Sequence, residues 1–211
     1  MHYFFTFILL VFTSCSFLHK DLDWNDYVKY INDADHGLVK KKYINHLEFT
    51  MQYLPPEYLV HRELNGDTSY TVTERDSILN LYNHNLTFVL SIQPDEREGE
   101  SPIEDVLFYN IKDKDEYTFR MMHLNFDIKD EVTLSCDSSA VYSPVITNME
   151  NNYGLSKGRK ITLVFTPLKS KEEFLKAKQI TLNWNDEVFE TGRQYFSFDA
   201  SELFSIPGLK L

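Results

Sequence analysis

Residues 132–136 read Val132-Thr133-Leu134-Ser135-Cys136, an alternation of apolar and polar side chains. Successive side chains of a β-strand point to opposite faces of its sheet, so this alternation predicts a strand with one buried face. Cys136 falls on the apolar face, where a free cysteine behaves as a small buried hydrophobe. We therefore predict a half-buried strand, and a packing role for Cys136 in place of a nucleophilic one.

Similar segments surround this stretch at short spacing. Strand candidates occupy residues 103–111, 116–124, 128–136, 139–146, 160–166, 179–184 and 194–199. Turn-forming residues separate several of them: Lys112-Asp113-Lys114-Asp115, Lys157-Gly158 and Thr191-Gly192. Many antiparallel strands at this spacing predict a mainly β fold, an antiparallel β-sandwich or a similar sheet-rich domain.

The preceding half of the chain adds two strands and some helices to this prediction. Leu47, Phe49, Met51 and Tyr53 alternate with polar residues up to Pro55-Pro56, and residues 86–92 are rich in strand formers. Short helices are expected over residues 23–35, 73–81 and 170–177, with Asp23, Thr73 and Ser170 as N-terminal caps and Gly37 as a left-handed C-terminal cap. Residues 93–102 predict an exposed, mobile loop.

The chain begins with an apolar run, YFFTFILLVF over residues 3–12. It is too short to cross a hydrocarbon core, which takes roughly 20 apolar residues in a helix. Its length suits the apolar region of a signal peptide, roughly 7–15 residues, and small residues follow it. The alternative is a buried helix or strand at the start of the domain.

The end of this run, Phe12-Thr13-Ser14-Cys15, resembles the lipobox of bacterial lipoproteins, in a relaxed form familiar among uncharacterised lipoproteins of the Bacteroidota. The resemblance covers residues 1–16 and departs from the common pattern at Phe12, where Leu is usual. It implies a signal peptide over residues 1–14 and a diacylglycerol on Cys15. From the patterns along the rest of the chain we expect a tether over 15–22 and a single sheet-rich domain over 23–211. It also implies the outer membrane as destination. The periplasmic face is favoured over the cell surface, because no acidic run follows Cys15. Ordinary cleavage near Ser14 is the alternative.

Cysteine usage and charge fit this interpretation. The chain has two cysteines, and lipidation of Cys15 would leave Cys136 without a partner, so no disulfide is expected. The 32 acidic residues against 21 basic ones give a net charge of −11. This balance argues against nucleic acid, whose phosphates are neutralised by Lys and Arg, and against adsorption to anionic lipid. Membrane association would then depend on the lipid.

Motifs for catalysis or metal binding are absent from the sequence. It contains no G-x-S-x-G, no phosphate-binding glycine loop and no H-E-x-x-H. Seven histidines, at positions 2, 19, 36, 46, 61, 84 and 123, lack ligand spacing and are interpreted as surface residues. The stretch from Asn32 departs from a calcium loop at Ala34 and Tyr43. Glu187 and Glu190 form a carboxylate pair that chance explains among so many acids. We expect no catalytic residue, no metal and no cofactor.

Four residues are candidates for binding or modification. Tyr58 and Leu59 follow a rigid Pro-Pro turn that would present them to a partner, although they would equally plug the edge of the sheet. Trp184 is a candidate exposed aromatic for a small ligand or glycan. Asp76-Ser77-Ile78 resembles the O-glycosylation site of the Bacteroidota, which makes Ser77 the acceptor.

The leading hypothesis is a membrane-tethered, non-enzymatic envelope lipoprotein that binds another protein, as an accessory subunit of an outer-membrane or secretion assembly. A small-ligand or glycan-binding module is the second hypothesis, and a hydrolase with a dispersed site is the third. An exposed apolar patch would favour the first. Exposed aromatics lining a groove would favour the second, and a cleft with convergent titratable groups would favour the third.

Overall fold

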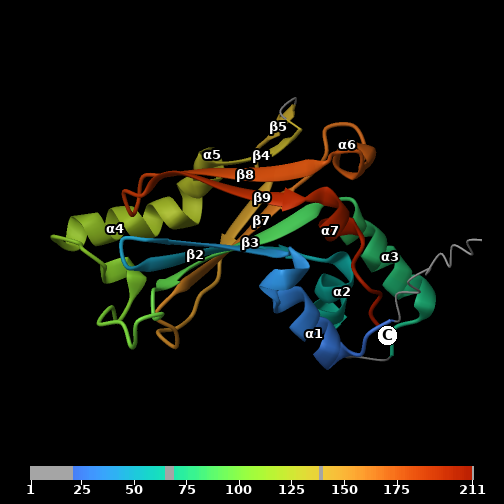
Figure 1. Ribbon diagram of the computed structural model, residues 1–211, viewed down its shortest axis with the longest axis horizontal. Coiled ribbons are helices and arrows are strands. Elements are labelled where there is room, and N and C mark those ends of the chain that lie inside the picture. Colours follow the sequence, from blue (N-terminus) through green and yellow to red (C-terminus); the bar gives the residue numbers. More distant parts are fainter. Residues whose placement is uncertain (1–20, 65–68, 138–139, 211) are drawn as a thin grey trace, which may run out of the picture.

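A computed structural model of the chain describes residues 21–64, 69–137 and 140–210. The expected signal peptide and the lipidation site Cys15 lie outside the described residues. Two antiparallel sheets face each other, with helices at both ends (Figure 1). The expected mainly β, sandwich-like fold class is confirmed. Among the described residues, no helix has the length and apolar character needed to cross a membrane.

The larger sheet has five strands in the order β1-β2-β3-β7-β6, and the smaller has four in the order β5-β4-β8-β9. The strands of the first are β1 (Val39–Ile44), β2 (Leu47–Leu54), β3 (Leu86–Pro94), β7 (Arg159–Phe165) and β6 (Ile146–Met149). Those of the second are β5 (Ala140–Tyr142), β4 (Val132–Cys136), β8 (Gln179–Asp186) and β9 (Gly192–Asp199). Each neighbouring pair is antiparallel.

Aromatic side chains from the inner faces join the two sheets. Phe88 of β3 lies 5.3 Å from Phe198 of β9 between ring centroids, and Phe49 of β2 lies 5.5 Å from Trp184 of β8. Such pairs contribute roughly 0.5–1.5 kcal/mol beyond the burial of their area. Cys136 is 5% exposed on the inner face of β4, so the prediction that it is a buried, unpaired core residue is confirmed.

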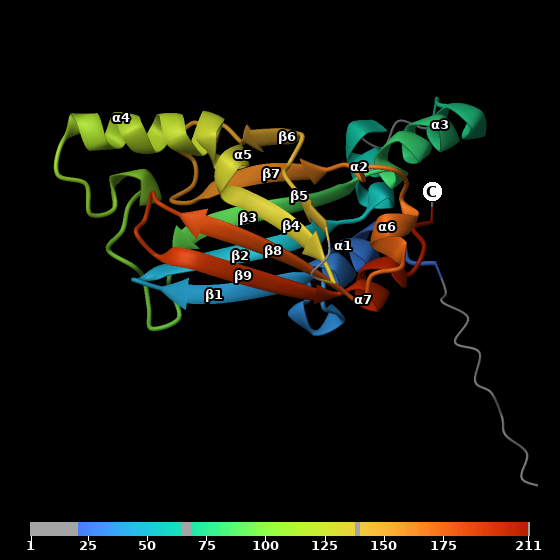
Figure 2. The same cartoon turned by 90° about the horizontal axis from the view of Figure 1, so that it is seen from above.

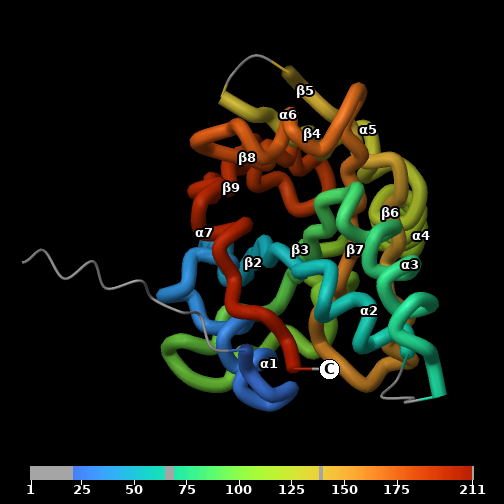
Figure 3. The backbone as a smooth tube through the Cα atoms, turned by 90° about the vertical axis from the view of Figure 1, so that its right-hand side faces the viewer, coloured from blue at the N-terminus to red at the C-terminus, as the bar shows by residue number. Residues whose placement is uncertain are grey.

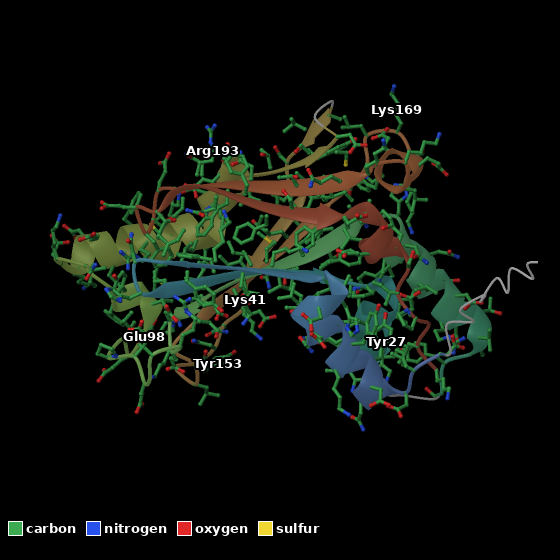
Figure 4. The ribbon with its side chains drawn as sticks, in the orientation of Figure 1. Tyr27, Lys41, Glu98, Tyr153, Lys169 and Arg193 are labelled. Carbon is green, nitrogen blue, oxygen red and sulfur yellow. The ribbon has the colours of Figure 1, made fainter. Side chains whose placement is uncertain are left out.

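Lysines of β1 protect one open edge of the sandwich, where β1 runs beside β9. The Lys40 ammonium lies 5.7 Å from the Phe198 ring, and that of Lys42 lies 5.4 Å from the Phe196 ring. Lys41 lies on the other side of β1 and pairs with Glu48 at 2.9 Å (Figure 4). Inward-pointing charges of this kind prevent edge-to-edge pairing with another chain. The sequence prediction did not include β1.

The helices are α1 (Trp24–Asn32), α2 (Pro56–Leu64), α3 (Val72–Asn83), α4 (Lys114–Met122), α5 (Ile128–Glu131), α6 (Glu172–Leu175) and α7 (Ala200–Phe204). Helix is therefore more abundant than the short N-terminal helix and one or two others that were expected. The prediction for α1 is confirmed, since the Asp23 carboxylate accepts a hydrogen bond from the Asp26 amide at 2.9 Å. Gly37, at φ +78°, ends the following 3-10 turn in the left-handed conformation predicted for it.

Two predicted strands are wrong. Residues 103–111 contain a 3-10 turn, Val106–Phe108, and residues 116–124 belong largely to α4 and the π-helical turn His123–Asp127 that continues it. Asp113 explains the difference, because its carboxylate caps α4 by accepting from the Glu116 amide at 2.9 Å. Acidic residues in the first turn also favour a helix.

The Pro-Pro segment does not form the expected turn. Pro56 opens α2 directly after β2, because proline fits the first turn of a helix, where its missing N–H costs nothing. The cap of α3 is Thr71, two residues before the predicted Thr73, and its hydroxyl and backbone both bond to Glu74. The described chain ends meet, since the Leu22 amide donates to the Gly208 carbonyl at 2.8 Å. The C-terminus lies beside α1 (Figure 3).

Candidate functional site

Trp184, the predicted exposed aromatic, is fully buried. It lies on the inner face of β8, on the same side of the strand as Leu182 and Ile180. Its indole Nε1 donates to the Glu131 carboxylate at 3.2 Å. The expectation that it presents an exposed ring to a ligand or glycan is wrong. Its physical role is to fill the core and to donate a hydrogen bond to a buried carboxylate.

Tyr58 and Leu59 lie half-buried on α2. The Tyr58 ring stacks on Trp24 at 5.4 Å, and Trp24 stacks in turn on His61 at 3.7 Å. Tyr58 therefore fastens α2 to α1, and its role in partner binding stays a prediction, as does that of Leu59. Ser77 is exposed on α3, where its hydroxyl donates to the Thr73 carbonyl at 2.8 Å. Its glycosylation also stays a prediction.

His123 is buried, in contrast to the surface position expected for it. Its Nε2 contacts the Glu131 carboxylate, and its Nδ1 lies 3.5 Å from Asp127. Burial raises the pKa of Glu131, and the hydrogen bonds from His123 and Trp184 act in the opposite direction. This network joins the π-helical turn to α5 and β8. The sequence signal for it was the spacing of four between His123 and Asp127, which places both on one side of a helix.

The outer side of α4 and its π-helical turn carries three exposed apolar side chains. Phe119, Met122 and Phe126 are 53%, 55% and 65% exposed, and their spacings of three and four residues put them on one side. We call these three residues the α4 apolar face. The helix lies at the outer end of the molecule, away from α1, α2 and α3 (Figure 1).

The inner side of the same helix carries a buried arginine among apolar side chains that pack against the core, of which Leu124 is fully buried. Arg120 is 4% exposed, and its Nη1 donates to the carbonyls of Val106, Leu107 and Tyr109 at 3.1, 3.3 and 2.7 Å. Burial lowers the pKa of this guanidinium. Since Arg120 and His123 anchor the helix through buried polar contacts, the apolar side chains on its opposite side are left facing solvent.

A cavity of about 370 Å³ adjoins Arg120. Its lining comes from the β1–β2 turn, from the segment that leads into α4, and from the β8–β9 turn: Asn45, His46, Tyr109, Asn110, Lys112, Glu116, Arg120, Val188, Phe189 and Glu190. Of the carboxylate pair noted in the sequence, Glu190 belongs to this lining and Glu187 does not. Figure 2 shows these two turns and the start of α4 at the same end of the molecule.

Metal binding finds no support in the part of the chain that the structure describes, where no group of three or more His, Cys, Asp or Glu side chains is placed to hold an ion. The described titratable groups instead form pairs that fasten elements together. Arg159 of β7, for example, donates to the Asp105 carboxylate at 2.6 Å and so holds the 3-10 segment against the sheet.

Comparisons with known proteins identify neither a family nor a function for this chain. No family model matches the chain, and no curated protein does. A solved structure from Burkholderia pseudomallei, described as a novel protein of unknown function, has 14% sequence identity and a TM-score of 0.41. The match covers 88% of this chain and 90% of the other.

Proposed function

We propose that this chain is a non-enzymatic cell-envelope lipoprotein whose domain binds a protein partner through the α4 apolar face. The observation that carries the proposal is the exposure of Phe119, Met122 and Phe126 together on one side of α4 and its π-helical turn. Exposed apolar residues gathered on one surface mark interaction sites in soluble domains. Aromatic and Met side chains are also enriched in protein interfaces.

The energy available from this face sets the kind of interface it supports. Full burial of an exposed Phe or Met side chain stabilises a complex by roughly 1.5–3 kcal/mol. Because these three side chains are 53–65% exposed before binding, covering them supplies roughly half of that each, or roughly 3–5 kcal/mol in all. Association costs about 4–15 kcal/mol in lost rigid-body freedom. The α4 apolar face therefore serves as the centre of a larger contact, as suits an accessory subunit of an outer-membrane or secretion assembly.

The test is co-purification from the native host with a matched control. The α4 variant carries Phe119→Ser, Met122→Ser and Phe126→Ser. The control carries Val72→Ser and Leu81→Ser on α3, whose side chains are 65% and 71% exposed, at the other end of the molecule. A stoichiometric partner should accompany the wild type and the control and be lost from the α4 variant. Loss from both variants, or from neither, would contradict the assignment to α4.

The proposed tether is tested separately. Lipidation of Cys15 should add a diacylglycerol mass to the mature chain and place it in the outer-membrane fraction, on the periplasmic face. A Cys15→Ala form should lose both properties, whereas a Cys136→Ala form should keep them. A Cys15→Ala chain with unchanged mass and membrane retention would refute lipidation and leave the α4 proposal to its own test.

A further inference from the structure

The cavity beside Arg120 has the size of a small-molecule site, and most of its lining residues are polar. Its volume of about 370 Å³ lies near the lower end of the range for ligand pockets, roughly 300–1,000 Å³. It lies where three loops meet at one end of the sandwich, which is a common position for binding sites because a rigid scaffold holds the loops in place. Neither the α4 apolar face nor the proposed tether takes part in it.

Arg120 supplies a buried cation whose guanidinium is only partly used within the domain. The residue is 4% exposed, and Glu116, Asp186 and Glu190 attract its charge without forming an ion pair with it. The carbonyls of the 3-10 segment accept hydrogen bonds from Nη1 alone. The Phe189 ring lies 4.8 Å from the guanidinium carbon. Nε and Nη2 donate to none of the described residues. A guanidinium that keeps N–H groups without protein partners can receive the carboxylate of an entering ligand through charge-assisted hydrogen bonds.

Carboxylates of the opposite sign face the same space. Glu190 forms no ion pair with any described residue, and the Glu116 carboxylate accepts from the Lys112 backbone amide at 2.8 Å. Lys112 adds a second cation to the lining, and its ammonium forms no ion pair in the described part of the chain. The cations and anions of this lining attract one another without forming direct ion pairs, and a ligand that carries both charges can pair with each of them.

The backbone holds Glu190 in place. Glu190 has a φ of +55°, a left-handed conformation that is uncommon for residues other than Gly, Asn and Asp. The buried Asp186 carboxylate enforces this turn by accepting from the amides of Val188, Phe189 and Thr191 at 3.0, 2.9 and 2.9 Å. The same turn sets Phe189 over Arg120, so one loop positions both the carboxylate and a wall of the cavity.

We propose that this cavity binds a small zwitterion of the amino-acid or dipeptide type, with its carboxylate at Arg120 and its ammonium at Glu190. Arg120 offers guanidinium N–H groups that match a carboxylate, and Lys112 adds attraction at the rim. Glu190 offers the acceptor for the ammonium. Neutral sugars gain less from this arrangement, because they form no ion pair with either group.

Isothermal titration calorimetry of the full-length chain in detergent micelles tests the proposal with L-alanine and L-alanyl-L-alanine as probes. We expect one or both to bind. N-acetylation of the bound probe removes its ammonium, and conversion to the amide removes its carboxylate. Each change should weaken binding roughly 10- to 100-fold, as for the loss of a charge-assisted hydrogen bond. The amide probe tests the Arg120 end without the risk of unfolding that substitution of a buried arginine brings.

Glu190→Gln should weaken binding by a similar factor, and Glu187→Gln is its matched control. Glu187 is an exposed carboxylate of the same turn that does not line the cavity. Absence of binding by both probes would overturn the proposal, as would equal binding of the acetylated or amidated forms. Equal losses in the two glutamate variants would overturn the assignment to this cavity. Because none of these variants touches the α4 apolar face, partner co-purification should be unchanged in them.

Discussion

Removal of the Tyr27 hydroxyl should stabilise the domain. Tyr27 lies among the helices at the right-hand end of the molecule in Figure 4, fully buried on α1. Its hydroxyl oxygen has no hydrogen-bond partner among the described residues. Folding therefore strips water from this group without replacing the bond. The change to test is Tyr27→Phe, which removes one oxygen atom and leaves the ring in place.

The expected size follows from two opposing terms. A buried polar group without a partner costs about 1–3 kcal/mol, and the substitution recovers that cost. The space left by one oxygen is smaller than that left by a methyl group, whose loss costs ~1 kcal/mol. The net gain should be about 1 kcal/mol, and for a domain of this size that corresponds to a rise in Tm of about 2–4 °C.

Thermal and urea unfolding, followed by circular dichroism, measure this gain. Tyr142→Phe is the matched control, because Tyr142 is also buried but its hydroxyl donates to the Glu173 carboxylate at 2.8 Å. That control should lose about 1 kcal/mol. If Tyr27→Phe lowers stability as well, the Tyr27 hydroxyl must have a partner in solution, such as a buried water, and the reasoning is refuted.

Three further predictions concern the thiol, a glycine and an ion pair. Burial raises the pKa of Cys136 to about 11 from 9.0, so the thiol should resist alkylation at pH 8 until urea unfolds the chain. The stability that the buried neutral thiol contributes should be lost as the pH rises from 9 to 11. Rapid labelling of the native chain would contradict this. Gly37→Ala should lower the free energy of unfolding by about 1–2 kcal/mol or more, because φ is +78° and the new Cβ meets the Glu202 carboxylate. An unchanged midpoint of urea unfolding would contradict this prediction. Asp105→Asn should lower the free energy of unfolding by about 3–5 kcal/mol, since it leaves the buried guanidinium of Arg159 without the carboxylate that lies 2.6 Å away. A loss of stability below 1 kcal/mol would show that water reaches this pair.

Alternation of side chains predicted several strands of this protein correctly. Residues 132–136, 160–165 and 179–184 lie in strands, and Cys136 is buried as predicted, whereas residues 128–131, also predicted as strand, form α5. The same logic failed for residues 116–124. There Tyr117, Phe119 and Met121 also alternate with polar residues, but the Asp113 carboxylate caps a helix.

The candidate sites were out of reach of the sequence, because each depends on segments far apart in the chain. Nothing near Trp184 indicates that its ring packs against Phe49 and its indole bonds to Glu131. Similarly, Arg120 and Glu190 line one cavity only because the turn between β8 and β9 returns to the start of α4.

The sequence by itself determined the sheet-rich class, the helix α1 and the apolar segment that predicts export and a lipid on Cys15. These follow from the periodicity, length and capping of neighbouring residues. Tertiary structure alone decided which side of α4 is buried. Apolar side chains occur on both sides of this helix, so its own sequence does not say which side is buried. Contacts with distant segments decide it: Leu124 packs in the core, Arg120 bonds to the carbonyls of the 3-10 segment, and Phe119, Met122 and Phe126 face outward.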